Sequence, residues 1–341
     1  MLTQALQESG KVWRTALGAL VLLVAAGCGK EAPKTEAAPA TSAPTAGADA
    51  AIPLNIGTLK IAALSNLYAA EKLGHFKEEG LKVTFTQMGG GAELLPAVSA
   101  GKIDITLSIP SSAIQARDKG FDFKMVMQNE IAAKEGEDTQ AIFVNADAGI
   151  AGPKDLKGKR IAVNHIKNQT WLSMVEVLSK NGIDKNAVSF IELPYPNMED
   201  ALLNKQVDAV FNVEPFTSKM AANSKLRAIS YPAVEALPGQ PIGAFWASEK
   251  WLASHEQAAQ KFVNAMRKTN EYLQKNPEET QKLIAEFTGI NIDTIKKMKP
   301  IMWNANVDKA TVQTLIDLMK RHELINSDMK ADTVLYSTAV K

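Results

Sequence analysis

Residues 59–112 alternate strand-like and helix-like segments, and this order restricts the possible folds more than any other feature of the sequence. The apolar run Leu59–Leu64 is typical of a buried strand, and Leu81–Thr86 alternates apolar and polar residues as strands do. Ile103–Ile109 predicts a third strand, and residues with helical spacing fill both intervals between the three. Because parallel neighbours need a long return path, which a helix supplies, this order predicts parallel strands with right-handed crossovers.

The same order of segments recurs about 100 residues later in the chain. It predicts strands at Arg160–Asn164, Val188–Leu193 and Val207–Val213, with helices at Thr170–Lys180 and Met198–Asn204 between them. Two copies of one α/β unit predict two similar lobes with a cleft between them.

The remaining segments predict how the lobes are connected. Strands are expected at Phe121–Gln128, Ala141–Asn145 and Ile242–Ala247, and the polar stretch Glu130–Asp138 is expected to be a surface loop. The last two of these strands flank the second lobe, so they predict a hinge of two crossings. Helices that should pack back on the first lobe are predicted at Lys250–Gln274, Pro277–Thr288, Ile292–Met298 and Lys309–His322.

The fold class predicted from these patterns is α/β, with two parallel-sheet lobes joined by a two-strand hinge. Residues 52–146 and 241–341 are expected to form the first lobe, and residues 147–240 the second. Composition agrees with a globular protein, since 46% of the residues are hydrophobic and 22% are charged. The net charge of +1 argues against nucleic acid as a partner, because phosphate binding needs a strong basic surplus.

The first 28 residues are expected to be a targeting signal rather than part of the fold. Lys11 and Arg14 are followed by the apolar stretch Thr15–Gly27, which is too short to cross a hydrocarbon core of roughly 30 Å as a helix. The stretch ends directly before Cys28, the only cysteine of the chain. This arrangement resembles a bacterial lipoprotein signal, although Ala25 stands where that signal prefers Leu. The alternative is a plain secretory signal with an incidental cysteine.

Residues 29–51 are rich in Ala, Pro and Thr and contain no aromatic residue. Such a segment cannot bury enough apolar surface to order itself, so we expect a disordered tether. If Cys28 is acylated after signal cleavage, a lipid anchor would be the only link between the folded part and the membrane. A single cysteine and four histidines exclude a disulfide framework and any multi-cysteine metal site, and no metal or cofactor is predicted.

From Leu54 to Val340 the chain resembles the substrate-binding proteins of ABC importers, in the nitrate/sulfonate/taurine-binding family that also includes proteins for thiamine-pyrimidine precursors. The resemblance implies a two-lobed periplasmic-binding-protein fold (type II) that closes on a small molecule and delivers it to a permease, outside the cytoplasm and as a monomer. The residues that carry it are Leu73–Phe76, Gly80-Leu81, Gly89–Gly91, Gly101–Asp104, Gly152–Ala162, Val207–Ala209 and Glu214–Phe216.

Candidate ligand-binding residues follow from the rule that ligands sit beyond the carboxyl ends of the strands in open parallel sheets. Two of these loops enter predicted helices near Ala92 and Thr170, where unpaired amides and the helix dipole favour an anionic group. The predicted ligand-binding residues are Ser65, Asn66, Tyr68, Gly89, Gly90, Gly91, Ser111, Ser112, Asn164, His165, Thr170, Trp171, Glu214, Phe216 and Trp246.

Each kind of candidate has a structural alternative. The three glycines let backbone approach a ligand, or they form only a flexible turn. The aromatic residues could stack on a flat ligand or pack in the core, and in a strand only one of Phe245 and Trp246 can face the cleft. Glu214 could hold an amine or could join the lobes, and His165 could pair with an anion or belong to a solvated loop.

The function expected from the sequence is therefore capture of a small organic molecule, sulfonate-like, taurine-like or heterocyclic, for an ABC importer. A ligand-binding sensor would share the same cleft. An enzyme is disfavoured, because the sequence has no P-loop, HExxH or serine-protease order of residues. The pyrimidine-precursor synthases of the same fold carry a Cys-rich segment, whereas Cys28 lies outside the predicted lobes.

Overall fold

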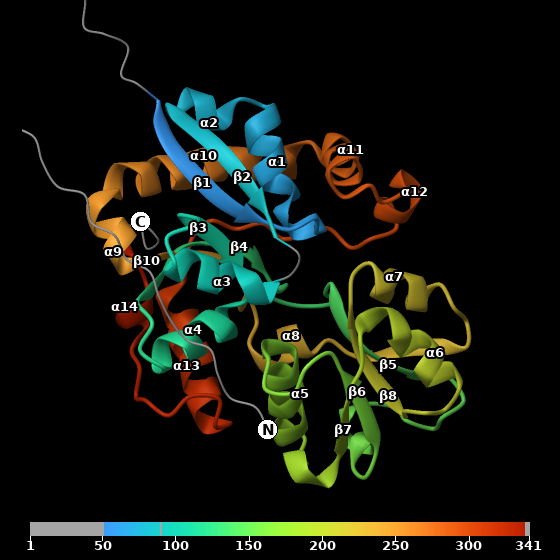
Figure 1. Cartoon of the computed structure of the whole chain (residues 1–341). Coiled ribbons are helices and arrows are strands. Elements are labelled where there is room, and N and C mark those ends of the chain that lie inside the picture. The colour runs from blue at the N-terminus through green and yellow to red at the C-terminus, as the bar shows by residue number, and fades with distance from the viewer. Residues whose placement is uncertain (1–50, 89–90, 338–341) are drawn as a thin grey trace, which may run out of the picture. The chain divides into compact units, whose positions relative to one another are not determined.

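The computed structural model describes residues 51–88 and 91–337 (Figure 1). The predicted signal peptide, Cys28 and nearly all of the predicted tether lie outside the described residues, as do Gly89 and Gly90. Two five-stranded sheets with helices around them make up the described part, and both belong to one compact unit of the chain. This confirms the predicted two-lobed α/β fold.

The first sheet has the strand order β2-β1-β3-β10-β4. Its strands are β1 (Ile52–Thr58), β2 (Leu81–Gln87), β3 (Ile105–Ser108), β4 (Phe123–Ile131) and β10 (Pro241–Ser248). β1 pairs in parallel with β2 and β3, while β10 is antiparallel to both β3 and β4.

The second sheet repeats this plan in the order β7-β6-β8-β5-β9. Its strands are β5 (Gln140–Asn145), β6 (Arg160–Val163), β7 (Ser189–Glu192), β8 (Ala209–Val213) and β9 (Leu226–Ser230). β6 pairs in parallel with β7 and β8, while β5 is antiparallel to both β8 and β9.

Each sheet is thus mixed rather than purely parallel, which corrects the prediction of parallel-sheet lobes. The antiparallel strand of each sheet is the one that the chain enters from the other lobe. Such a strand starts at the edge of the sheet where the strands beside it end, so it must run in the opposite direction to them. β5 also precedes the lobe boundary that we predicted at residue 147, yet it is hydrogen-bonded into the second sheet. The division of the remaining residues between the lobes stays a prediction.

The predicted first strand, Leu59–Leu64, is wrong. β1 ends at Thr58, and residues Ala62–Leu64 form a 3₁₀ turn that leads into α1 (Ser65–Lys72). β1 pairs with β2 over its whole length, from Ile52 with Leu81 to Thr58 with Gln87. The segment Leu59–Leu64 contains two alanines, which favour a helical turn over a strand.

The helices cover the faces of both sheets (Figure 1). The helices that follow α1 and precede the second crossing are α2 (His75–Glu78), α3 (Gly91–Ser99), α4 (Pro110–Asp118), α5 (Gln169–Lys180), α6 (Met198–Leu203), α7 (Phe216–Ala221) and α8 (Pro232–Ala236). Those after the second crossing are α9 (Glu249–Ser254), α10 (Glu256–Lys275), α11 (Pro277–Thr288), α12 (Ile292–Ile295), α13 (Lys309–Arg321) and α14 (Ala331–Val334).

Adjacent residues of β10 show how the first sheet is covered on both faces. Phe245 packs against Phe262 of α10 on one face, and Trp246 belongs to the cluster that α13 covers on the other. Both side chains are fully buried. The C-terminal helices therefore pack on the first lobe, as expected. α13 also reaches the second lobe, where His322 Nε2 lies 2.9 Å from Glu176 Oε2 of α5.

Two segments of chain cross between the sheets, one from β4 to β5 and one from α8 to β10. They are hydrogen-bonded to each other, since Ala132 N donates to Gln240 O at 2.9 Å and Gly239 N donates to Ala133 O at 3.2 Å. The predicted surface loop Glu130–Asp138 is this first crossing. Asp138 is buried there, and its carboxylate accepts hydrogen bonds from the amides of Ala133 and Gln140.

Candidate functional site

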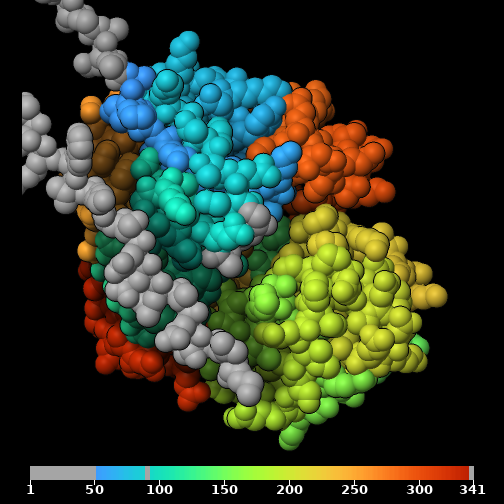
Figure 2. All heavy atoms as spheres, in the orientation of Figure 1, coloured from blue at the N-terminus to red at the C-terminus, as the bar shows by residue number. Residues whose placement is uncertain are grey.

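A cavity of about 470 Å³ is lined by residues from both sheets and from Thr139 of the first crossing. The surface is hollowed where the blue-to-teal atoms of the first sheet meet the yellow-green atoms of the second (Figure 2). A volume of this size lies within the usual range for small-molecule sites, roughly 300–1,000 Å³. The lining is mostly apolar and includes Ile61, Leu107, Ile109, Met298 and Ile301.

The first-lobe wall begins with the turn after β1, where Lys60, Ile61, Ala62 and Ala63 line the cavity. Buried polar side chains hold this turn in place from behind. Ala63 O accepts hydrogen bonds from Asn129 Nδ2 at 2.8 Å and from Trp303 Nε1 at 3.0 Å. The position of the turn is therefore fixed by groups that lie outside the cavity.

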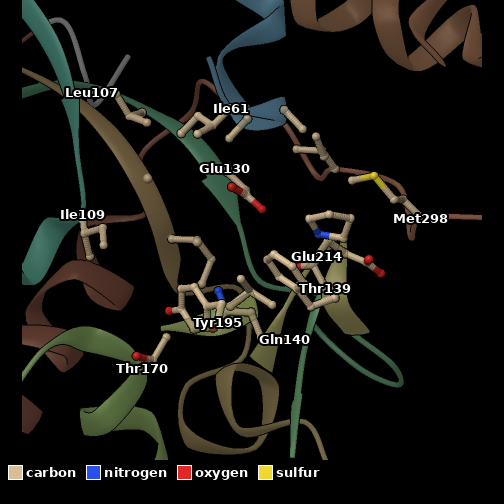
Figure 3. A pocket seen from close by; sticks show the side chains of 18 of the residues that line it. Ile61, Leu107, Ile109, Glu130, Thr139, Gln140, Thr170, Tyr195, Glu214 and Met298 are labelled. Carbon is tan, nitrogen blue, oxygen red and sulfur yellow. The ribbon is translucent and has the colours of Figure 1, made fainter. Parts of the chain in front are cut away.

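Glu130, near the end of β4, is the second main feature of the first-lobe wall. Its carboxylate points into the cavity (Figure 3). Among residues 51–88 and 91–337 it forms no hydrogen bond or ion pair. Burial raises the pKa of Glu130 to about 7, and the neighbouring Asp138 carboxylate adds to the shift. The site thus contains an acid that is partly protonated near neutral pH.

Glu214, from the second lobe, also lines the cavity, but its carboxylate is already engaged. It accepts hydrogen bonds from the hydroxyl and the amide of Ser218, at 2.7 and 3.3 Å. It also accepts from the amide of Lys299 at 3.2 Å. The segment around Lys299 joins the first sheet through the bond from Ile131 N to Met302 O. Glu214 therefore connects the lobes, which is the structural alternative that the sequence left open.

A buried amide network closes the cavity on the hinge side. Gln169 is only 4% exposed, and its Nε2 donates to Pro241 O at 2.5 Å and to Gln240 Oε1 at 3.2 Å. Its Oε1 accepts from Ser111 N at 3.2 Å, which ties α4 to α5. Gln240 Nε2 in turn donates to Ser173 Oγ at 3.2 Å. The network fixes the crossing segment relative to both lobes.

Three of the predicted site residues, Thr170, Glu214 and Phe216, line the cavity. The Thr170 hydroxyl donates to Asn168 Oδ1 at 2.6 Å. Thr170 also interacts with the hydroxyl of Tyr195, a cavity residue whose pKa is raised chiefly by burial. Whether these three residues contact a ligand stays a prediction.

The predicted polar residues of α1 lie behind the cavity wall. Ser65 and Asn66 are buried, and Ser65 Oγ donates to Ala62 O at 2.7 Å. Asn66 Nδ2 donates to Asn129 Oδ1 at 2.7 Å and to Asn270 Oδ1 at 3.0 Å. These side chains support the cavity-lining turn, because Asn129 itself bonds to Ala63.

The structure places three of the predicted aromatic residues in packed surroundings rather than in the cavity wall. Tyr68 stacks on Phe287 with ring centroids 5.7 Å apart. Trp171 is 4% exposed and packs edge-on against Phe190 in the second-lobe core. Trp246 is fully buried in the first-lobe core. For all three, the core-packing alternative describes the observed contacts.

Four further predicted residues, Ser111, Ser112, Asn164 and His165, are not among the described residues that line the cavity. Ser111 is buried at the start of α4, while Ser112 beside it is exposed. Asn164 is half-buried, and His165 is exposed with Nδ1 3.7 Å from Glu192 Oε1. Gly91 is the first residue of α3.

Sequence reasoning missed Glu130, Thr139, Gln140, Gln169, Tyr195 and the loop that contains Met298 and Ile301. Four of these residues lie on or beside the crossings, and the loop follows α12. A signal for some of them is the segment Glu130–Asp138, which is rich in charged residues and lies between two apolar strands. The sequence predicts this segment to be a surface loop.

Among the described residues no group of three or more His, Cys, Asp or Glu side chains could hold a metal ion. Within the same residues, no helix combines the length and the apolar character needed to cross a membrane.

A family model described as "NMT1/THI5 like" matches residues 62–280, more than half of the chain. A Bacillus subtilis protein described as aliphatic sulfonates-binding is 28% identical over 159 residues, which cover 46% of each chain. A 4-amino-5-hydroxymethyl-2-methylpyrimidine phosphate synthase of Aspergillus parasiticus is 21% identical over 62% of this chain and 63% of its own. The chain therefore matches between about half and two thirds of the length of these relatives.

The fold is similar to that of a solved structure, the periplasmic aliphatic sulphonate binding protein SsuA of Escherichia coli. The TM-score is 0.71 at 18% identity, and the match covers 84% of this chain and 98% of that one. At this identity the likeness describes the fold alone.

Proposed function

The chain belongs to the NMT1/THI5-like family, and from this premise we propose that it is an extracytoplasmic solute-binding protein of an ABC importer. In this proposal the cavity holds a small organic molecule, and the closed lobes present that molecule to the permease. One observation carries the proposal: residues of both sheets and of the first crossing line a single cavity. An occupant of the cavity would contact both lobes at once.

The two crossings support a movement of one lobe relative to the other about a shared hinge. They are hydrogen-bonded to each other between residues 132–133 and 239–240. Because the occupant contacts both walls, its affinity is highest when the lobes are closed, and this difference shifts the population towards the closed state. Closure would then be the signal that the permease recognises.

Binding rather than catalysis fits the chemistry of the cavity. Among the described residues that line it there is neither a Cys nor a His. Its one carboxylate without a hydrogen-bond partner, Glu130, lies among Ile61, Leu107 and other apolar side chains. The similarity to a pyrimidine phosphate synthase extends over part of each chain at 21% identity. A ligand-binding sensor would use the same cavity and differ only in its membrane partner.

We also propose that Cys28 is acylated after signal cleavage and that this lipid is the protein's only link to the membrane. The predicted tether of residues 29–51 would then allow the lobes to reach the permease.

A thermal-shift screen with the whole mature chain tests the proposed function. The screen uses sulfonates, taurine, thiamine precursors, flavins and aromatic acids and amines. Because a molecule that binds only the native state raises its melting temperature, we expect at least one compound to stabilise the wild-type protein. The variant Ala63→Trp fills the cavity from the first-lobe turn, and it should lose this shift.

The matched control is Ala253→Trp, which adds the same side chain at an exposed position of α9. This variant should keep the ligand-induced shift. A shift that remains undiminished in Ala63→Trp would place the binding site outside the cavity and contradict the proposed function.

A further inference from the structure

We propose that the cavity selects an organic cation, an amine or amidine with an apolar body, and that Glu130 is the residue that recognises its positive nitrogen. This inference rests on the proposed function and names the class of its solute. It departs from the sulfonate expected from the sequence and from the sulfonate-binding descriptions of two similar proteins.

Glu130 has no counter-charge among the residues that the structure describes. The one charged group that shifts the pKa of its carboxylate is Asp138, which carries a carboxylate itself. The Asp138 oxygens are used by the amides of Ala133 and Gln140 and by the Thr139 hydroxyl. A carboxylate in apolar surroundings is costly unless a positive or hydrogen-bond-donating group accompanies it. A cationic ligand would supply that group.

The helix N-termini beside the cavity are where an anion would bind, but side chains of the protein accept hydrogen bonds from amides there. Asn168 Oδ1 caps α5 by accepting from Trp171 N at 2.8 Å. The Gln169 side chain accepts from Ser111 N at the start of α4, and Glu214 accepts from Ser218 N in α7. Since side chains of the protein already occupy these amides, a sulfonate would have to displace them.

The lining around the carboxylate is mostly apolar. Ile61, Leu107, Ile109 and Ile242 line the same cavity as Glu130, and Tyr195 contributes an aromatic ring (Figure 3). Such a wall holds the apolar body of a ligand, while one charge-assisted hydrogen bond fixes its orientation. A small inorganic anion would use neither feature.

Lys60 is the one cationic side chain among the described cavity-lining residues. It is exposed, and Glu130 shows no electrostatic effect from it. Lys60 could therefore attract an anion to the opening of the cavity, and the experiment includes it for that reason.

Isothermal titration calorimetry at pH 8 tests the inference by measuring the binding of cations and anions that all contain a phenyl ring. The cations are benzamidine, phenethylamine and phenyltrimethylammonium, and the anions are benzoate, 3-phenylpropionate and benzenesulfonate. We expect wild-type protein to bind at least one cation more tightly than every anion. Glu130→Gln keeps the size of the side chain and removes its charge, and it should weaken cation binding by at least about tenfold.

Glu71→Gln serves as the control, because it removes an exposed carboxylate of α1 and should leave cation binding unchanged. Lys60→Met removes the one cation among the described cavity-lining residues, so it should strengthen cation binding slightly.

Three results would overturn the inference. These are tighter binding of any anion than of the cations, unchanged cation affinity in Glu130→Gln, and no binding of any cation by wild-type protein at millimolar concentration. Anion binding that is tighter than cation binding and is lost in Ala63→Trp would reject the inference and leave the proposed function standing. Binding of either class that Ala63→Trp does not affect would contradict the proposed function itself.

Discussion

The first-lobe wall of the cavity presents a carboxylate without a hydrogen bond or ion pair to any described residue, whereas the polar groups of the second-lobe wall are bonded to neighbours. Glu130 represents the first wall. Gln169, Thr170 and Glu214 represent the second, and each has at least one hydrogen bond of 3.3 Å or less. Both walls belong to sheets with the same strand plan, so the difference comes from side chains and not from topology.

This comparison separates two roles that a sequence does not distinguish. Bonded polar groups such as Gln169 and Glu214 position the walls and connect the lobes. A polar group that faces the cavity without a partner is free to meet the ligand. The two carboxylates therefore differ in their hydrogen bonding even though both line one cavity.

The largest change in the free energy of unfolding is expected from a substitution in the second-lobe wall. Gln169→Ala leaves Ser111 N, Gln240 Oε1 and Pro241 O without their partner. Since each unsatisfied buried group costs about 1–3 kcal/mol, the free energy of unfolding should fall by about 2–4 kcal/mol. Urea unfolding followed by circular dichroism measures this loss.

Gln206→Ala is the control, because Gln206 is exposed in the turn after α6. It should change stability by less than about 0.5 kcal/mol. If Gln169→Ala were equally mild, the second-lobe wall would not be the rigid one, and the comparison would fail.

A substitution in the first-lobe wall, Glu130→Gln, is expected to change the free energy of unfolding by a smaller amount and in the opposite direction. Because the folded pKa of Glu130 is about 7, the folded protein keeps a proton that the unfolded chain loses above about pH 4.5. Stability contributed by this group therefore falls as the pH rises from about 4.5 to 7. Glu130→Gln removes this titrating group. The free energy of unfolding of the variant, relative to that of wild type, should therefore rise by about 1–3 kcal/mol between pH 4 and pH 8.

Asp138, Glu214 and Lys60 are the other charged groups of this part of the site, and all three are present in both proteins. Unfolding of the ligand-free protein at four or five pH values gives the difference. A constant difference across this range would mean that Glu130 is hydrated like a surface glutamate.

The sequence predicted the fold well because its signals are local. The strand and helix periods of both lobes lie within the segments themselves, and Pro277–Thr288 was predicted with its observed bounds. Ala62–Leu64 was misassigned because a short apolar run with alanines is compatible with a strand or a helical turn.

The site was harder to predict because burial and pairing are properties of the folded chain. Trp171 and Trp246 stand at loop-proximal positions, but the direction of each side chain sends it into a core. The sequence predicts Glu130 in a surface loop, since the segment Glu130–Asp138 is rich in charged residues. Only the pairing of β4 with β10, which places Glu130 opposite Gly243, brings it to the cavity wall.

We propose that one inter-lobe cavity binds the solute, that its first-lobe wall recognises the ligand and that its second-lobe wall positions the lobes. A crystal structure of the protein with the most stabilising compound from the thermal-shift screen tests this claim most directly. We predict that the compound lies in the cavity, contacts both the Ile61–Ala63 turn and Tyr195, and places a nitrogen within hydrogen-bond distance of the Glu130 carboxylate. A compound bound to one lobe only, or away from these residues, would contradict the account.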